Sequence, residues 1–203
     1  VAGSSAFANS KNDNYLLLGL MSSKLGTYIL KLSDPTLNFQ VENILAMPFY
    51  NGIRKNEEEI ISRVNELISI TEIDWNSFET SWDFQVSPLI SVNADMIKDA
   101  SFNWMNSNRD TVIKTQALEK EVNQIYIDAY GLQQELIADV PLEEITLTVN
   151  PKYRYGGDAS EQELAERFQS DTIAEFISYA LGCMVGRYSL DREGLVYAHS
   201  TND

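Results

Sequence analysis

Six polar side chains in the first quarter of the chain have types and spacings that suit contact with DNA. Lys24 and Lys31 lie seven residues apart, which puts them on one helix face, two turns from each other. Asn38 and Gln40 flank Phe39, so in an extended segment both amides point to the same side, and amides of this kind pair with adenine edges. The alternative is a solvated polar face. The candidate phosphate and base contacts are Lys24, Lys31, Asn38, Gln40, Arg54 and Lys55.

The distribution of charge restricts where a polyanion could bind. The chain of 203 residues carries a formal net charge of -15. Residues 1–55 hold five basic and three acidic residues, a net of +2, whereas residues 56–203 hold ten basic and 27 acidic residues, a net of -17. Because neutralising phosphates requires lysine and arginine, DNA contact is expected only in the first quarter. The acidic remainder is expected to be a spacer or a protein-docking surface.

Other residue types offer little chemistry. Cys183 is the only cysteine and His199 the only histidine, which excludes an internal disulfide and a zinc site built from these residue types. Pairs such as Glu143-Glu144 are expected in a chain with 30 acidic residues, and a solvated face explains them better than acid–base catalysis. We therefore expect no catalytic residue and no metal site.

The setting is expected to be the cytoplasm, without membrane contact. No apolar run reaches the roughly 18 residues that a membrane helix needs, and a single cysteine suits a reducing compartment. The chain begins with an apolar segment and without methionine. We expect both ends to be cut from a longer polypeptide.

Apolar spacing and capping signals predict most of the helices. The predicted helices cover residues 14–32, 56–70, about 94–130 and 160–185. Ser160 followed three residues later by Glu163 is a capping box, and Gly131 is expected to end the longest helix, with Leu132 folding back on it. A second capping box at 71–74 predicts another short helix.

Two segments are expected to be strands, and one stripe is expected to pack between helices. Residues 37–41 alternate apolar and polar, and residues 145–149 are rich in β-branched side chains. Asn150-Pro151 then predicts a turn. The stripe predicts packing between two antiparallel helices, with an intermolecular coiled coil as the alternative; its members are Leu118, Val122, Ile125 and Ala129.

Residues 16–49 resemble the closing section of the target-recognition domains of restriction–modification specificity proteins and fused methyltransferases. Those sections have a helix of the form LLG-x-LNSK and then an NFQ-x-x-x-I-x-x-x-P segment. Ser22-Ser23-Lys24 takes the place of the Asn-Ser-Lys of the helix in this chain. The members of that segment in this chain are Asn38, Phe39, Gln40, Ile44 and Pro48. Further blocks resemble the C-terminal half of phage-exclusion (BREX-type) adenine-specific DNA methyltransferases: 75–84, 125–136, 140–157 and 171–198.

The resemblance implies a non-catalytic part of an enzyme that methylates adenine N6. The Asn150-Pro151-Lys152-Tyr153 run resembles the Asn-Pro-Pro-Tyr loop that holds the flipped adenine in such enzymes, but Lys152 replaces the second proline. The chain also lacks the family's glycine-rich loop, so S-adenosylmethionine would bind elsewhere in the full-length enzyme. The implied partners are DNA, the catalytic domain of the same polypeptide and other defence-system proteins.

The expected fold is mainly α with a few short β-strands (α+β), in which long antiparallel helices follow the end of a target-recognition domain. The expected divisions are the end of that domain over residues 1–55, a helical spacer or bundle over residues 56–140, and a short strand plus a C-terminal helix over residues 141–203.

Overall fold

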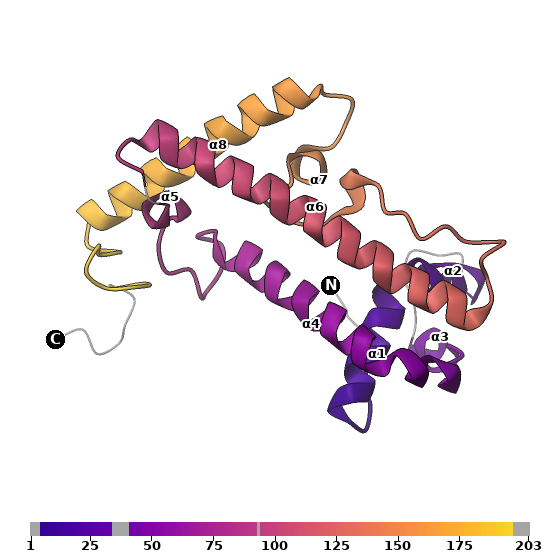
Figure 1. The fold of residues 1–203 in the computed structure, drawn as a ribbon. Coiled ribbons are helices and arrows are strands. Elements are labelled where there is room, and N and C mark those ends of the chain that lie inside the picture. The colour runs from indigo at the N-terminus through magenta and orange to yellow at the C-terminus, as the bar shows by residue number, and fades with distance from the viewer. Residues whose placement is uncertain (1–4, 34–40, 93, 197–203) are drawn as a thin grey trace. The chain divides into compact units, whose positions relative to one another are not determined.

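The computed structural model describes residues 5–33, 41–92 and 94–196 as helices joined by turns and extended loops (Figure 1). The elements that contain at least ten residues are α1 (Lys11–Ser22), α2 (Lys24–Ser33), α4 (Glu57–Asn76), α6 (Ile97–Tyr130) and α8 (Glu161–Met184). The shorter elements are α3 (Val41–Leu45), η1 (Asn51–Asn56), α5 (Pro88–Ser91), η2 (Leu142–Glu144) and α7 (Pro151–Tyr155), where η marks a 3₁₀ helix. No helix within the described residues has the length and apolar character needed to cross a bilayer.

The chain divides into two compact units. Unit 1 consists of residues 1–68 and 116–140, and unit 2 of residues 69–115 and 141–203. The long helices α4 and α6 each supply residues to both units.

The core of unit 1 is mainly aliphatic and surrounds one tyrosine. Tyr126 on α6 is fully buried, and its hydroxyl donates a hydrogen bond of 2.6 Å to the carbonyl oxygen of Leu16 on α1. The buried residues around it come from α1, α2, η1, α4 and α6 and include Leu16, Leu20, Leu25, Ile53, Ile60, Val64 and Val122. These side chains hold the first half of α4 and the last half of α6 in one core.

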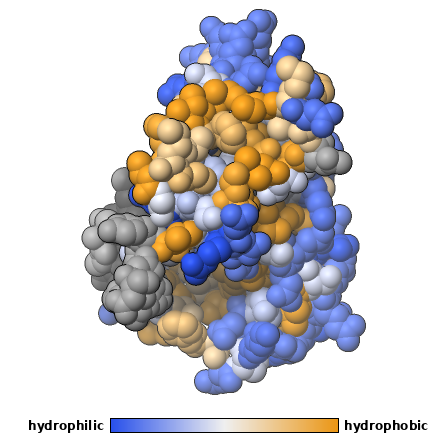
Figure 2. Space-filling model, turned by 90° about the vertical axis from the view of Figure 1, so that its left-hand side faces the viewer, coloured by the Kyte–Doolittle hydropathy of each residue, from blue (hydrophilic) through white to orange (hydrophobic). Residues whose placement is uncertain are grey.

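Aromatic rings make up much of the interior of unit 2. Trp104 on α6 stacks on Phe168 of α8, with ring centroids 5.6 Å apart, and Phe84, Tyr179 and Tyr188 form a second cluster. Part of the surface of this unit is apolar as well. Figure 2 shows a broad apolar area on the face that carries α5, the start of α6 and the end of α8. Exposed apolar residues on these elements are Ile90, Ile97, Ile177, Leu181 and Met184.

The expectation of short strands is wrong, because the described residues contain none. The segment from Ile145 to Val149 is a loop that turns at Thr148 and Val149, and its amide groups do not meet a neighbouring strand. The N–H groups of Thr148 and Val149 instead donate to the carboxylate of Asp74 on α4, at 2.7 and 2.9 Å. A side chain therefore takes the place of a partner strand. The other expected strand falls on residues 37–41, of which 37–40 lie outside the described residues.

The expected pair of long antiparallel helices is also wrong. The helix pairs with the most extensive contacts in the described part of the chain are α1 with α2, α2 with α3, α7 with α8, and α7 with η2, and each includes a helix of 12 residues or fewer. Val122, from the predicted stripe, instead enters a core that also contains residues of α1, α2, η1 and α4.

The helix predicted over residues 14–32 is two helices that meet at Ser23. Ser23 has an extended backbone, with φ -82° and ψ 163°. Its hydroxyl donates to the Leu20 carbonyl at 2.6 Å and accepts from the Gly26 N–H at 3.1 Å. The Lys24 N–H donates to the side chain of Asn123, which comes from α6. Local and distant polar groups together satisfy the backbone at the break.

Several helix ends are confirmed. Ser160 is the N-cap of α8 and forms the capping box with Glu163. Gly131 follows α6 with a φ of +71°, and the Leu132 N–H donates to the Ile127 carbonyl, as in a Schellman motif. The short helix expected after Thr71 is instead the last part of α4.

Candidate functional site

Four of the six predicted DNA-contact residues lie on two helices of unit 1. Lys24 and Lys31 both lie on α2, where Lys24 is half-buried and Lys31 is exposed. Arg54 and Lys55 lie on η1 and are exposed. Asn38 and Gln40 lie outside the described residues, so base contact by these two amides stays a prediction.

Arg54 is held by carboxylates. Its Nη2 atom lies 2.7 Å from Asp13 Oδ1, and its Nη1 atom lies 3.4 Å from Glu57 Oε2. The hydrogen bond to Asp13 raises the pKa of Arg54, and hydrogen bonds from Ser10 and Arg54 lower the pKa of Asp13. A phosphate bound to Arg54 would therefore compete with two carboxylates.

The Asn150-Pro151 motif starts a helix. The Asn150 side chain accepts from the Lys152 N–H at 3.2 Å and caps the start of α7. Its amide nitrogen donates to the carbonyl oxygens of Leu142 at 2.7 Å and Ile145 at 2.9 Å. Because Asn150 is buried and these bonds use its oxygen and nitrogen, the side chain stabilises the local fold and is not free to hold a base.

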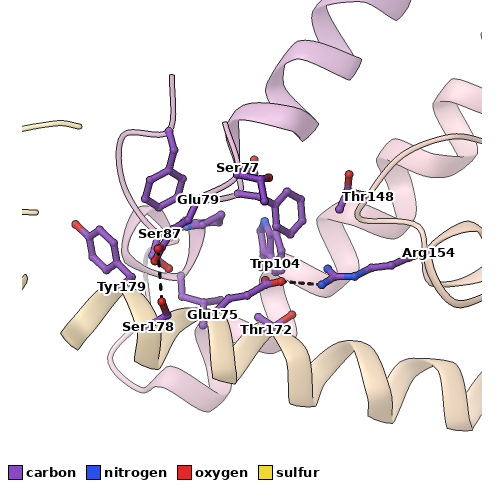
Figure 3. A pocket seen from close by; sticks show the side chains of 15 residues that line it. Ser77, Glu79, Ser87, Trp104, Thr148, Arg154, Thr172, Glu175, Ser178 and Tyr179 are labelled. Atoms are coloured by element: carbon purple, nitrogen blue, oxygen red, sulfur yellow. Dashed lines mark hydrogen bonds and ion pairs between the residues drawn. The ribbon is translucent and has the colours of Figure 1, made fainter. Parts of the chain in front are cut away.

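Unit 2 contains a cavity of about 250 Å³. Its lining comes mainly from four helices, α5, α6, α7 and α8, and from the loop that follows α4. Its apolar walls are Phe78, Phe84, Leu89, Trp104 and Tyr179. Hydroxyl groups, two glutamates and one arginine complete the lining. In Figure 3, Glu175, Ser178 and Thr172 project from α8 on one side, and Ser77, Glu79 and Trp104 face them.

Arg154 from α7 closes one side of the cavity. Its Nη2 atom lies 2.7 Å from Glu175 Oε1, the contact drawn in Figure 3. Its guanidinium also lies over the rings of Phe78, at 5.4 Å, and Phe168, at 5.8 Å. Burial opposes the charge of Arg154, but the hydrogen bond and charge of Glu175 outweigh burial and raise its pKa. The Nη1 atom is buried and has no hydrogen-bond partner among the described residues.

Glu79 lies on the other side of the cavity. Its Oε2 atom accepts a long hydrogen bond of 3.5 Å from Ser178 and lies 3.8 Å from Arg187 Nη1. Its Oε1 atom is buried without a hydrogen-bond partner in the described part of the chain. Nearby, burial and the Glu79 carboxylate raise the pKa of Tyr188, and burial and Cys183 raise the pKa of Tyr179 to about 12.

The sequence did not point to this cavity. Trp104 is expected from the sequence to pack in a core or interface, and it is 9% exposed. Glu79, Arg154 and Tyr179 belong to no recognisable motif, because they come from a loop and two helices that are distant in sequence. One feature of the sequence could have indicated a polar site in this region. On the face of α6 that carries Ser101, Trp104 and Asn108, polar residues interrupt an otherwise apolar stripe.

Two curated proteins match nearly the whole chain. An adenine-specific methyltransferase, BrxX, from Escherichia coli O9:H4 (strain HS) is 38% identical over 98% of this chain. An adenine-specific methyltransferase, PglX, from Lacticaseibacillus casei (strain Zhang) is 32% identical over 97% of it. The matches cover 16% and 15% of those proteins, so the chain spans about a sixth of their length. No protein-family model matches the chain.

These matches support a relation to adenine-specific methyltransferases of the phage-exclusion (BREX) type, which the sequence blocks had indicated.

Proposed function

We propose that this chain is a non-catalytic segment of an adenine-specific DNA methyltransferase of a phage-defence or restriction–modification system. The observation that carries the proposal is the alignment of almost the entire chain with about a sixth of two proteins named as adenine-specific methyltransferases. The use of Asn150 as a helix cap supports a structural role for the one motif that resembles a methyltransferase loop. S-adenosylmethionine would bind outside this segment.

In this proposal unit 1 contributes to DNA target recognition and to the positioning of the catalytic domain. Lys24 and Lys31 on α2 and Arg54 and Lys55 on η1 are the phosphate contacts, and at Arg54 a phosphate would compete with Asp13 and Glu57. Asn38 and Gln40 would face base edges. The enzyme would act in the cytoplasm, where the catalytic domain of the same polypeptide and other defence proteins would be its partners.

The salt dependence of DNA binding tests this role. The 203-residue chain should bind duplex DNA weakly, with an affinity that falls as salt rises. The Lys24→Glu/Lys31→Glu variant should bind all DNA sequences less tightly. The slope of the logarithm of its binding constant against the logarithm of the salt concentration should become shallower by about 0.9 for each phosphate that a lysine no longer neutralises. Lys98→Glu, an exposed lysine of unit 2, is the matched control and should keep the slope.

Two results would contradict the proposal. DNA binding that does not depend on salt, or equal effects from the α2 pair and Lys98→Glu, would remove unit 1 from DNA recognition. Stoichiometric binding of S-adenosylmethionine to the chain in calorimetry would contradict its non-catalytic role.

A second candidate role, an acidic module that docks on a basic protein partner, is favoured by the charge of unit 2. This unit contains 18 acidic and eight basic residues, a net of -10, whereas unit 1 has a net of -5. The two roles are compatible because they use different units.

A further inference from the structure

The cavity of unit 2 combines apolar walls with carboxylates. Four of its lining residues are aromatic: Phe78, Phe84, Trp104 and Tyr179. Glu79 and Glu175 supply two negative charges and Arg154 one positive charge, so the lining is net negative. Aromatic faces and carboxylates both favour a cation over an anion.

One carboxylate in the lining is incompletely paired. Glu79 uses Oε2 toward Ser178 and Arg187, but Oε1 is buried without a hydrogen-bond partner in the described residues. A buried carboxylate oxygen that lacks a donor is destabilising, by an amount that a bound N–H group would recover. The lining is therefore suited to a ligand that donates hydrogen bonds.

Arg154 shows that these walls accept a guanidinium. Its charged group already lies over Phe78 while it pairs with Glu175. Glu79, on the other side of the cavity, forms an ion pair of 3.8 Å with Arg187, which does not line the cavity, and its Oε1 atom keeps no hydrogen-bond partner in the described residues. A second cationic group would find there the same combination of ring and carboxylate.

We propose that this cavity binds the arginine or lysine side chain of a basic polypeptide partner. The aliphatic stem of the side chain packs against the aromatic walls, and its charged end donates to the Glu79 carboxylate. The net charge of -10 on unit 2 favours a basic protein and opposes a nucleic acid.

The surface beside the cavity supports a polypeptide rather than a free small cation. Helix α5 supplies Leu89 to the cavity and Ile90 to the exposed apolar area, and α8 supplies Ser178 to the cavity and Ile177 to that area. A chain that inserts a basic side chain therefore has apolar surface within one helical turn for its neighbouring residues (Figure 2).

The test is binding of a blocked Gly-Arg-Gly peptide to the 203-residue chain. Calorimetry measures the affinity, and the shift of the Trp104 indole signal in NMR reports binding at the cavity. We expect saturable binding to the arginine peptide and binding at least about tenfold weaker to the same peptide with citrulline, which has the same shape without the charge. Equal binding of the two peptides would overturn the proposal. Preferential binding of a short single-stranded oligonucleotide would also overturn it.

Two variants locate the site. Glu79→Gln should lower the affinity for the arginine peptide about tenfold. The control is Glu72→Gln, which changes an exposed glutamate of the same unit and should leave the affinity unchanged. Thr80→Arg places a competing cation at an exposed position of the lining and keeps the test valid if Glu79→Gln unfolds; its matched control is Asn106→Arg on α6. Equal effects of a cavity variant and its control would show that the peptide binds elsewhere.

Discussion

Buried polar side chains in unit 1 join separate elements, whereas several in unit 2 keep unused hydrogen-bonding atoms. In unit 1, Tyr126 bonds to α1, and Asn123 bonds to the start of α2 and, at 3.1 Å, to the Ala138 carbonyl. In unit 2, atoms of Ser101, Asn108 and Arg154 are buried without a hydrogen-bond partner among the described residues, whereas the corresponding atom in the described part of unit 1, Arg63 Nε, still lies 2.6 Å from Glu121 Oε2. Native proteins contain few such groups, and those that occur often mark a binding site or a bound water.

This difference suggests different roles. A core whose polar groups are satisfied within the fold has one stable arrangement and suits a rigid support. A core with unsatisfied groups around a cavity gives up some stability, and a ligand could recover it. Unit 1 therefore has the character of a scaffold, and unit 2 that of a binding unit.

The largest expected effect tests the scaffold. Tyr126→Ala removes a fully buried ring from the core of unit 1 and should lower the free energy of unfolding by about 4 kcal/mol. Tyr126→Phe keeps the ring and removes only the hydrogen bond to Leu16, so it should cost about 1 kcal/mol. Urea unfolding followed by circular dichroism measures both. If the two variants lose the same amount, the hydrogen bond and not the packing holds this core.

The next effect concerns the carboxylate that replaces a strand in unit 2. Asp74→Ala leaves the N–H groups of Thr148 and Val149 without their acceptor and should cost about 3 kcal/mol. Glu72→Ala, two residues earlier on the exposed side of α4, should change the unfolding free energy by less than about 0.5 kcal/mol. A small loss at Asp74 would mean that the segment from Ile145 to Val149 is held by its apolar contacts alone.

A smaller effect tests how tightly the aromatic cluster is packed. A Cβ atom at Gly182 would lie 2.6 Å from the ring of the buried Tyr188, so Gly182→Ala should cost about 2 kcal/mol. In a Tyr188→Leu background the same change should cost less than half as much, because the obstructing ring is gone. Thermal unfolding of the four proteins forms a double-mutant cycle. Additive losses would show that the ring moves aside at no cost.

The sequence was sufficient for features that depend on neighbouring residues. The capping box at Ser160 and the glycine end of α6 were predicted correctly because each is defined within six residues of chain. The relation to adenine-specific methyltransferases was likewise visible in short blocks such as 171–198.

The features that the sequence did not reveal depend on contacts between distant residues. Ile145 to Val149 has the composition of a strand, but its amides bond to Asp74, more than 70 residues earlier. The break at Ser23 is completed by Asn123, 99 residues from Lys24. The cavity has the same character, since Glu79, Trp104, Arg154 and Tyr179 become neighbours only in the folded chain.

The smallest expected effect lies at the start of α8, which supplies one wall of the cavity. Ser160→Ala removes the side chain that accepts the Glu163 N–H and should cost about 1 kcal/mol near neutral pH. Hydrogen bonds from the Ser160 hydroxyl and backbone N–H lower the pKa of Glu163 in the folded protein. A carboxylate whose pKa is lower when folded stabilises the fold above its unfolded pKa, and that contribution disappears as the pH falls through the folded value.

The wild-type protein should therefore lose part of its advantage over Glu163→Gln on acidification, since the glutamine variant has no proton to gain at this position. Urea midpoints of both proteins near neutral pH and at about pH 3 measure the change. Glu166→Gln, one turn further along α8 and outside the capping box, serves as the control for removing a charge. A difference between wild type and Glu163→Gln that stays the same at both pH values would mean that the carboxylate charge does not stabilise the cap, and that the start of α8 is held by the hydroxyl of Ser160 alone.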